Sequence, residues 1–469
     1  MLFSSIFFIN VFLPLTFLFY QLSNKTVRNF VLLVASLLFY AWGEPSYLVV
    51  MLINIVLTYF SAMLLQQIVI KQVRLLCLII SLIINFSSLF YFKYFNFVCD
   101  NINSLFGGNF NFSNIVMPIG ISFYTFQSVS YLIDVYRKEV FAQKNFYNLA
   151  LYISLFPQLV AGPIVKYHDI NNQIDERVNS FNNIICGFKR FIIGLGKKVL
   201  IANPMGEIAD KIFEQSPDAY PWYIAWIGAL SYTMQIFFDF SGYSDMAIGL
   251  GRVFGFKFKE NFNYPYISTS ITEFWRRWHI SLSTWFKEYL YIPLGGNRNG
   301  NIRTYINLSI VFLATGIWHG AAWNFVLWGI WNGFFIVLEK IIGVKKFIGN
   351  NFYSKFLLHF YCSLIFILGW VLFRSKDVEF AGKYFFNMFG LQKCKQSLYD
   401  ILYYVDIIPI VVFIVACLCS TPIFKHIFFY FVRNVFFRFL VNIYLLLIFV
   451  LSIIVLSSNS YNPFIYFRF

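Results

Sequence analysis

Residues 439–458 read FLVNIYLLLIFVLSIIVLSS, a run of 20 residues without a charged side chain. A helix rises about 1.5 Å per residue, so a run of this length spans the hydrocarbon core of a bilayer. Similar runs recur along the chain, which predicts an all-α protein that crosses the membrane many times. We place twelve spans at about 2–22, 30–43, 46–66, 75–95, 115–135, 183–203, 222–250, 304–321, 322–340, 356–374, 403–421 and 439–458.

The composition excludes a soluble protein of this size. Of the 469 residues, 59% are hydrophobic and only 12% are charged, whereas a soluble chain carries roughly twice that charge. The 36 basic and 21 acidic side chains give a formal net charge of +15, which in a soluble chain would suggest nucleic acid as a partner. Here the bases lie between apolar runs. We therefore expect them to set topology and to contact membrane lipid headgroups, and we expect no nucleic-acid partner.

The distribution of bases along the loops predicts the topology. Loops rich in Lys and Arg face the cytoplasm, whereas the loops 96–114 and 204–221 are poor in bases and are predicted outside, with both termini. Residues 2–22 lack a basic start and a cleavage site, so they are predicted to be a retained first span. The predicted cytoplasmic loops are those with Lys25, Lys71, Lys144, Lys345 and Lys425, together with the stretch 252–303.

Residues 149–165, LALYISLFPQLVAGPIV, are apolar but are broken by Pro157, Gly162 and Pro163. Exposed broken backbone would leave polar groups unsatisfied in lipid, so we expect a kinked or re-entrant element inside the protein. No repeat or flexible linker divides the chain, and we treat residues 1–469 as one membrane domain. The seven cysteines have no paired spacing, which predicts neither a disulfide framework nor a metal site.

Residues 235–333 differ from the flanking spans because they are dense in Gly, Trp and ionisable residues. His319 follows Tyr305 on an apolar helix and is expected about 20 Å further along it. Gly316 and Gly320 flank this histidine and allow another backbone or a ligand to come close. A neutral imidazole at that depth can accept a proton from an attacking hydroxyl and return it later. The alternative is a histidine that only packs between helices.

His279 lies in EFWRRWHISLSTWFKEYLYIPLGG, whose aromatic and basic residues predict an amphipathic element on the cytoplasmic face. On composition alone, an interfacial histidine and a functional one are equally expected there. Asp239, Ser241 and Tyr243, in the sequence DFSGYSD, place carboxylate and hydroxyl groups near the end of a span. They are candidates to line a polar entrance for substrate, or to order the backbone around Gly242.

Three segments of this region resemble the membrane-bound O-acyltransferases. They read DFSGYSDMAIGLGRVFGFKFKENFNYPY, EFWRRWHISLSTWFKEYLYIPLGGNR and GIWHGAAWNFVLWGIWNG. MPIGISFYTFQ and LFPQLVAGPIVKY extend the likeness, so that it covers about 117–333 as a family core. The branch it resembles includes the alginate O-acetylation membrane protein and peptidoglycan O-acetyltransferase A.

The resemblance implies a ring of about 12 transmembrane helices around a tunnel that joins cytoplasm and periplasm. It implies that His319 of the WHG motif is catalytic, that His279 is the second functional histidine, and that Trp318 lines the tunnel. The donor would be acetyl-CoA or a similar cytoplasmic acyl thioester, with no cofactor held permanently. A periplasmic, esterase-like acetyltransferase partner would deliver the acetyl group to a polysaccharide, so the protein is expected in the bacterial inner membrane.

The aromatic tail that follows the last span, within 439–469, ends NPFIYFRF. FIYFRF is similar to the terminal motif of a small membrane peptide that accompanies the teichoic-acid D-alanylation transferase of this family, whose tyrosine is a proposed acyl relay. By that match, Tyr466 would be the relay. A phenol has a pKa of about 10, so its ester is an activated acyl donor. An aromatic anchor at the membrane interface is the alternative.

Two classes of function fit the sequence, an O-acetyltransferase and a polytopic transporter or scramblase. Inverted repeats, which mark many transporters, are not found, and the His–Trp–Gly stretch favours the enzyme. The acetylated polymer is predicted to be peptidoglycan, with an alginate-type exopolysaccharide as the alternative. That choice follows from the heavy use of Phe, Ile, Asn and Lys, which indicates an AT-rich coding sequence.

Overall fold

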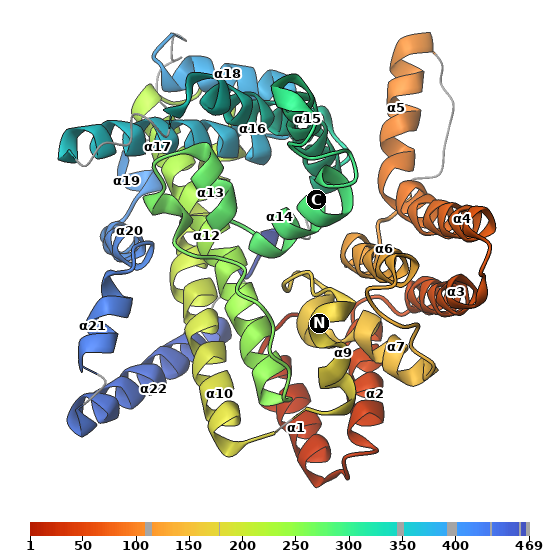
Figure 1. Cartoon of the computed structure of the whole chain (residues 1–469). Helices are drawn as coiled ribbons and strands as arrows, with labels where there is room; N and C mark the ends of the chain where they lie inside the picture. Colours follow the sequence, from red (N-terminus) through yellow and green to blue (C-terminus); the bar gives the residue numbers. More distant parts are fainter. Residues whose placement is uncertain are drawn as a thin grey trace. The chain divides into compact units, whose positions relative to one another are not determined.

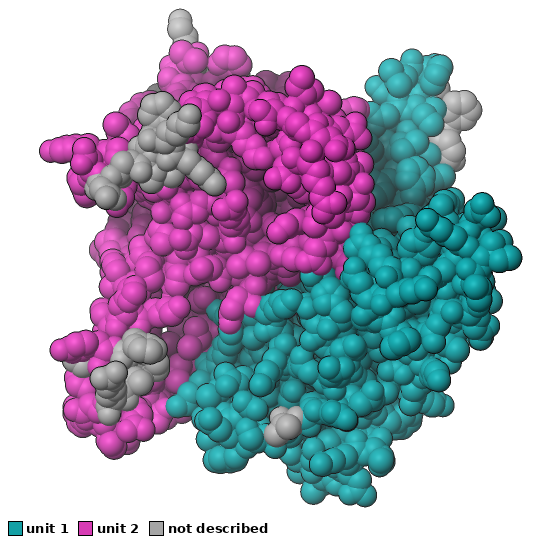
Figure 2. Space-filling view, in the orientation of Figure 1, with its two compact units in different colours: residues 1–191, 244–259 teal, residues 192–243, 260–469 magenta. Residues whose placement is uncertain are grey.

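The computed structural model describes residues 1–107, 115–177, 179–344, 351–391, 401–431, 434–458 and 461–465, and within these residues every regular element is a helix. The all-α prediction is therefore confirmed (Figure 1). The chain divides into two compact units. Unit 1 comprises residues 1–191 and 244–259, and unit 2 comprises residues 192–243 and 260–469 (Figure 2).

The helices of unit 1 bury one side and expose large apolar side chains on the other. In α2, Phe30, Val34 and Leu38 are 53%, 40% and 60% exposed, while Leu32 and Phe39 are buried. Such a stripe is costly in water and is expected of a surface that faces lipid. The helices are η1 Phe8–Phe12, α1 Leu13–Leu22, α2 Arg28–Ala41, α3 Leu48–Gln67, α4 Lys71–Leu89, η2 Phe90–Tyr94, α5 Phe95–Phe106, α6 Ile121–Arg137, α7 Phe146–Ser154, α8 Phe156–Leu159 and α9 Tyr167–Asp175.

The broken segment 149–165 is buried, as predicted. α7 ends at Ser154 and the four-residue α8 follows, with almost every side chain of both helices hidden. The interrupted backbone is satisfied by neighbours: the amide of Phe156 donates to the hydroxyl of Ser36, and the hydroxyl of Tyr152 donates to the carbonyl of Val165. Buried partners replace the water that lipid cannot supply.

The base-rich segments of unit 1 are hydrogen-bonded or ion-paired to neighbouring helices and loops. The guanidinium of Arg74 donates to the carbonyl of Val135, and the hydroxyl of Tyr59 donates to the carbonyl of Lys144. Lys259 forms an ion pair with Asp169 at 2.6 Å. The side of the membrane on which these base-rich segments lie stays a prediction.

Unit 2 contains most of the region 235–333 that is rich in Gly, Trp and His, whereas residues 244–259 belong to unit 1. α15 and α16 form an antiparallel hairpin, α17 packs on α16, and the short α13 contacts both α16 and α17. α10 Phe181–Gly196 and α12 Trp222–Val253 run through both units. The other helices are η3 Lys197–Ala202, α11 Asn203–Phe213, η4 Pro265–Ile267, α13 Ile271–Arg277, α14 Ile280–Phe286, η5 Lys287–Tyr291, α15 Gly300–His319, α16 Trp323–Ile342, α17 Phe352–Arg374, α18 Val378–Met388, α19 Ile401–Tyr404, α20 Ile407–Cys419, α21 Ile423–Phe431 and α22 Val435–Ser458.

Within the described residues, five helices are long and apolar enough to cross a membrane alone. The other predicted spans also fall on helices, but some are too short or too polar to qualify. α6 is an example: nearly all its side chains are buried, including Ser128, Gln127 and Asp134, so it is an internal helix whose polar groups face protein. The number of twelve spans stays a prediction. The five are Leu48–Gln67, Lys71–Phe106, Trp323–Ile342, Phe352–Arg374 and Val435–Ser458.

Candidate active site

His319 is the last residue of α15, where the helix stops at an extended Gly320. Its ring is 6% exposed and meets three aromatic rings nearly edge-on. The centroid of the imidazole lies 5.0 Å from that of Trp318, 4.9 Å from that of Trp328 and 5.1 Å from that of Phe373. The three rings enclose the imidazole and leave it little contact with water.

The glycines beside His319 allow the close packing that the sequence predicts. A Cβ on Gly316 would lie 2.5 Å from the carbonyl oxygen of Phe325, and one on Gly329 would lie 2.5 Å from that of Phe312. The backbones of α15 and α16 therefore touch at this point, as small residues permit in membrane helices. A Cβ on Gly320 would lie 2.3 Å from the Phe325 ring.

His279 lies at the kink between α13 and α14, with a left-handed φ of 44°. It is 1% exposed, so its ring faces protein. The amphipathic segment bends here and turns the ring inward. Few residues other than glycine adopt this backbone conformation, and those that do are concentrated at functional sites.

The hydrogen bonds of His279 define its tautomer. Oδ1 of Asn261 accepts from the hydroxyl of Ser281 at 2.9 Å and lies 3.1 Å from Nδ1 of His279. Nδ1 therefore carries the proton and donates. Burial lowers the pKa of His279 to about 3, so the ring is neutral. Nε2 is a lone-pair acceptor, and it is buried with no hydrogen-bond partner among the described residues.

Trp318 brings the two histidines into one site. Its indole contacts His319 at 5.0 Å and His279 at 6.2 Å between ring centroids. His279 also packs against Phe240 of α12, at 4.6 Å. All four side chains belong to unit 2. The two histidines that the sequence analysis placed in one region therefore lie in a single aromatic cluster.

A cavity of about 10 Å³, room for roughly one water molecule, lies beside His319. The chain segment 461–465 reaches it, since Ile465 is among the lining residues. Phe464 and Ile465 are each only 4% exposed. The other lining residues are Ile236, Phe240, Trp278, Trp370 and Phe373.

A buried ion pair holds this tail segment. Lys198 of η3 and Asp239 of α12 lie 2.9 Å apart and are 3% and 1% exposed. Oδ2 of Asp239 accepts from the backbone N–H of Ile465 at 2.9 Å, and the ammonium of Lys198 donates to the carbonyl of Pro463. Both charges are thus paired and hydrogen-bonded, as buried charges must be.

A second polar contact fixes the start of the segment. The hydroxyl of Tyr461 donates to Oδ2 of Asp210 at 2.7 Å, and Arg374 donates to Oδ1 of the same carboxylate at 2.6 Å. Asn203 donates to the carbonyl of Tyr461 at 3.2 Å. Sequence reasoning missed Lys198, Asp210 and Arg374, because their partners lie far away in the sequence and no local pattern marks them.

The polar residues predicted to line an entrance have other contacts. Asp239 binds the tail, and the ring of Tyr243 stacks on that of Phe464 at 4.7 Å. Ser241 is buried, and its hydroxyl has no hydrogen-bond partner within the described part of the chain. Gly242 does serve close packing, since a Cβ there would lie 2.8 Å from the carbonyl oxygen of Gly194. Tyr466 lies outside the described residues.

A separate polar cluster in unit 1 was not predicted. Nδ1 of His168 lies 3.0 Å from Asp134 and Nε2 lies 3.2 Å from Asp169. The hydrogen bond to Asp134 contributes most, and with the bond to Asp169 it raises the pKa of His168 to about 9. Asp134, Glu139 and His168 bring possible ligand atoms within 4.8 Å of one another, but both ring nitrogens of His168 already lie at hydrogen-bond distance from carboxylates. We therefore interpret the group as an ion-pair cluster.

Comparison with known proteins adds to this geometry. Residues 137–376 match the profile of MBOAT, the membrane-bound O-acyltransferase family. The chain is 42% identical over 396 residues to a probable alginate O-acetylase of Pseudomonas syringae pv. tomato, covering 83% of this chain and 75% of that protein. It is 38% identical over 495 residues to a probable alginate O-acetylase of Pseudomonas putida, covering 100% of both. It is 38% identical over 426 residues to the peptidoglycan O-acetyltransferase of Helicobacter pylori, covering 83% of this chain and 80% of that protein.

Proposed function

This chain belongs to the membrane-bound O-acyltransferase family and is a multi-pass membrane O-acetyltransferase, and we propose that it transfers acetyl groups from a cytoplasmic thioester toward a cell-envelope polysaccharide. The family excludes the transporter or scramblase alternative. The observation that carries the proposal is the shared cavity of His319 and Ile465. In this cavity the buried His319 lies next to Ile465, and Tyr466 follows Ile465 in the sequence.

The reaction is an acyl transfer from sulfur to oxygen. His319 accepts the proton of a hydroxyl group, whose oxygen then attacks the carbonyl carbon of the acetyl thioester. The new C–O bond forms, the C–S bond breaks, and the thiolate takes the proton back from the imidazolium. The aromatic rings at 4.9–5.1 Å from His319 keep water from hydrolysing the thioester.

His279 is proposed to position the donor rather than to exchange protons with it. Its Nε2 stays unprotonated and can accept a hydrogen bond at neutral pH, because burial lowers the pKa of His279 to about 3. An acceptor held by a kinked backbone and by Asn261 can bind an N–H or O–H group of the donor in a fixed orientation. Acetyl-CoA, or a thioester of similar structure, offers such groups.

Tyr466 is proposed as the first acceptor. It directly follows Ile465, which lines the cavity beside His319. The phenol oxygen would receive the acetyl group, and a periplasmic, esterase-like partner would move it on to the polymer. A phenyl ester is a good donor for that second step, because phenolate is a better leaving group than a sugar alkoxide.

Peptidoglycan is the proposed polymer, and an alginate-type exopolysaccharide is the second candidate. Relatives named for each polymer match this chain at 38% identity over at least 83% of its length. The choice of peptidoglycan rests on the residue composition. The proposed location is the inner membrane of a bacterium, with the thioester on the cytoplasmic side.

One experiment in cells tests the polymer and the relay together. A strain that lacks the gene is complemented with the wild type or with Tyr466→Phe, and base-labile acetate is measured on purified peptidoglycan and on secreted exopolysaccharide. We expect acetate on peptidoglycan with the wild type and its loss with Tyr466→Phe, at equal protein levels. Acetate on the exopolysaccharide alone would replace the proposed polymer. Full acetylation with Tyr466→Phe would contradict the relay and leave direct transfer from the His319 pocket to the partner.

A further inference from the structure

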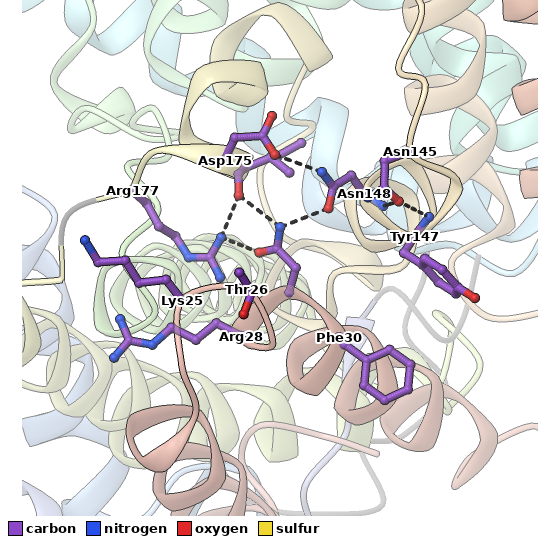
Figure 3. A pocket seen from close by; sticks show the side chains of 11 residues that line it. Lys25, Thr26, Arg28, Phe30, Asn145, Tyr147, Asn148, Asp175 and Arg177 are labelled. Carbon is purple, nitrogen blue, oxygen red and sulfur yellow. Dashed lines mark hydrogen bonds between the residues drawn. The ribbon is translucent and has the colours of Figure 1, made fainter.

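Unit 1 contains a cavity of about 380 Å³ that the acyl-transfer site does not use. Three segments meet around it: the turn between α1 and α2, the start of α7 and the end of α9 (Figure 3). The lining residues are Lys25, Thr26, Arg28, Asn29, Phe30, Asn145, Tyr147, Asn148, Ile174, Asp175 and Arg177.

The cavity has an excess of positive charge. Lys25, Arg28 and Arg177 line it, and Asp175 is the only carboxylate among the lining residues. Oδ1 of Asp175 accepts a hydrogen bond from Asn148 at 2.8 Å. The acid is therefore engaged with an amide rather than paired with one of the three cations. A concave site with one sign of charge attracts an ion of the opposite sign.

Two of the cations are held in place by the same ring. The guanidinium carbons of Arg28 and Arg177 lie 5.0 Å and 5.6 Å from the centroid of Tyr20. Arg177 also donates to the hydroxyl of Tyr20, to Oδ1 of Asn29 and to the carbonyl of Ile174. The positive groups are thus fixed close together by neutral partners. Their mutual repulsion is a cost that a bound anion would remove.

The surroundings of the cavity point to lipid. It lies where α1 ends and α2 begins, and both helices present exposed apolar side chains along their length. Phe19 and Leu22 of α1 are 58% and 75% exposed, and Phe30 of α2 starts a stripe that continues through Val34 and Leu38. A molecule with an anionic head and long apolar chains fits this combination, because the head can enter the cavity while the chains follow the stripes.

We propose that this cavity binds the phosphate-bearing headgroup of an anionic phospholipid. Lys25 supplies an exposed ammonium group, and Arg28 and Arg177 supply guanidinium groups that Tyr20 holds in place. The site does not depend on acyl transfer at His319, and it explains why three cations are gathered where neighbouring side chains offer them only neutral partners.

The test is lipid binding to the purified full-length protein in detergent, followed by native mass spectrometry with added phosphatidylglycerol or phosphatidylethanolamine. We expect tighter binding of phosphatidylglycerol. Each base near an anionic lipid contributes about a fivefold change in affinity, so Lys25→Gln should weaken binding by about fivefold and the double variant Lys25→Gln with Arg28→Gln by about 25-fold. Lys71→Gln is the matched control, because Lys71 is also an exposed base at a helix start but does not line the cavity. It should change affinity less than twofold.

Three results would overturn the proposal. They are equal affinity in the double variant, equal binding of phosphatidylethanolamine, and displacement of phosphatidylglycerol by micromolar coenzyme A or millimolar inorganic phosphate. The last would assign the site to a free phosphate compound instead. Lys25 is exposed and forms no ion pair within the described residues, so its single variant should melt like the wild type and keep the comparison valid.

Discussion

The backbone N–H of Ile465 donates a hydrogen bond of 2.9 Å to Oδ2 of Asp239. This bond joins residues that are 226 positions apart and places the segment 461–465 inside unit 2, beside His319. Asp239 has this role because Lys198 neutralises its other oxygen. The ion pair therefore serves to dock the tail.

If the pair docks the tail, weakening it should expose the tail. We predict that Asp239→Asn raises the rate at which a maleimide labels Ile465→Cys by at least about tenfold, in a background without native cysteines, because the amide cannot pair with Lys198. Ser241→Ala is the control, since Ser241 lies on the same helix and its hydroxyl has no partner among the described residues. It should leave labelling slow. Equal labelling rates in the two variants would show that the ion pair does not hold the tail in place.

Asn261 is predicted to be a positioning residue that acts through His279. Asn261→Asp keeps an acceptor for Nδ1 but adds a negative charge, which raises the pKa of His279 from its low value of about 3. The variant should therefore lose activity as the pH falls through the new pKa, because protonation removes the Nε2 acceptor. The wild type should show only the loss that protonation of the base His319 causes, and the variant should show a second loss in addition. Rates of thioester consumption from pH 4.5 to 8 measure this, and identical profiles would remove Asn261 from the site.

The contact between α15 and α16 should tolerate no side chain. A Cβ on Gly316 would lie 2.5 Å from a backbone oxygen that cannot move aside, so Gly316→Val is expected to destabilise the protein by about 3 kcal/mol or more. Gly382 of α18 is the control, because a Cβ there meets nothing within 4 Å. Gly382→Ala should be neutral or stabilising by about 0.5–1 kcal/mol. Thermal unfolding in detergent compares the two, and a stable Gly316→Val protein would contradict the packing.

The His168 cluster predicts how stability depends on pH. Hydrogen bonds to Asp134 and Asp169 raise the folded pKa of His168 to about 9, above the unfolded value of about 6.5. The stabilisation is therefore fully present below pH 6.5 and is lost as the pH rises through 9. Melting temperatures measured from pH 6 to 10 should fall over that window in the wild type and fall less in His168→Gln. The exposed His426→Gln is the control and should keep the wild-type slope. An unchanged slope in His168→Gln would contradict the ion-pair cluster.

Much of the fold follows from local patterns. Long apolar runs predicted helices such as α3 and α22, and the prolines and glycine in 149–165 predicted a break that is buried. The sequence also singled out His319, because an ionisable residue between two glycines on an apolar helix is costly unless it has a function. Its catalytic role stays a prediction. Each of these patterns lies within a short stretch of sequence, and so do the interactions that form a helix.

The remaining features depend on contacts between distant residues. No local signal shows that Lys198 meets Asp239 and the carbonyl of Pro463, since these pairings are decided by how helices pack. The burial of His279 was missed for a related reason. Its segment is amphipathic in composition, but the left-handed kink turns this one side chain inward. Asp239 and Tyr243 were singled out as candidates to line a polar entrance, but their contacts with the segment 461–465 could not be inferred from their own surroundings.

The most direct test is consumption of acetyl thioester by the purified protein in proteoliposomes, compared between the wild type and His319→Gln. Glutamine keeps the polarity and approximate size of the side chain but cannot accept a proton at neutral pH. We predict that the variant folds and melts like the wild type and loses at least about 100-fold in rate, the usual contribution of general base catalysis. Wild-type consumption by His319→Gln would contradict the assignment of this histidine as the base and, with it, the account of the site.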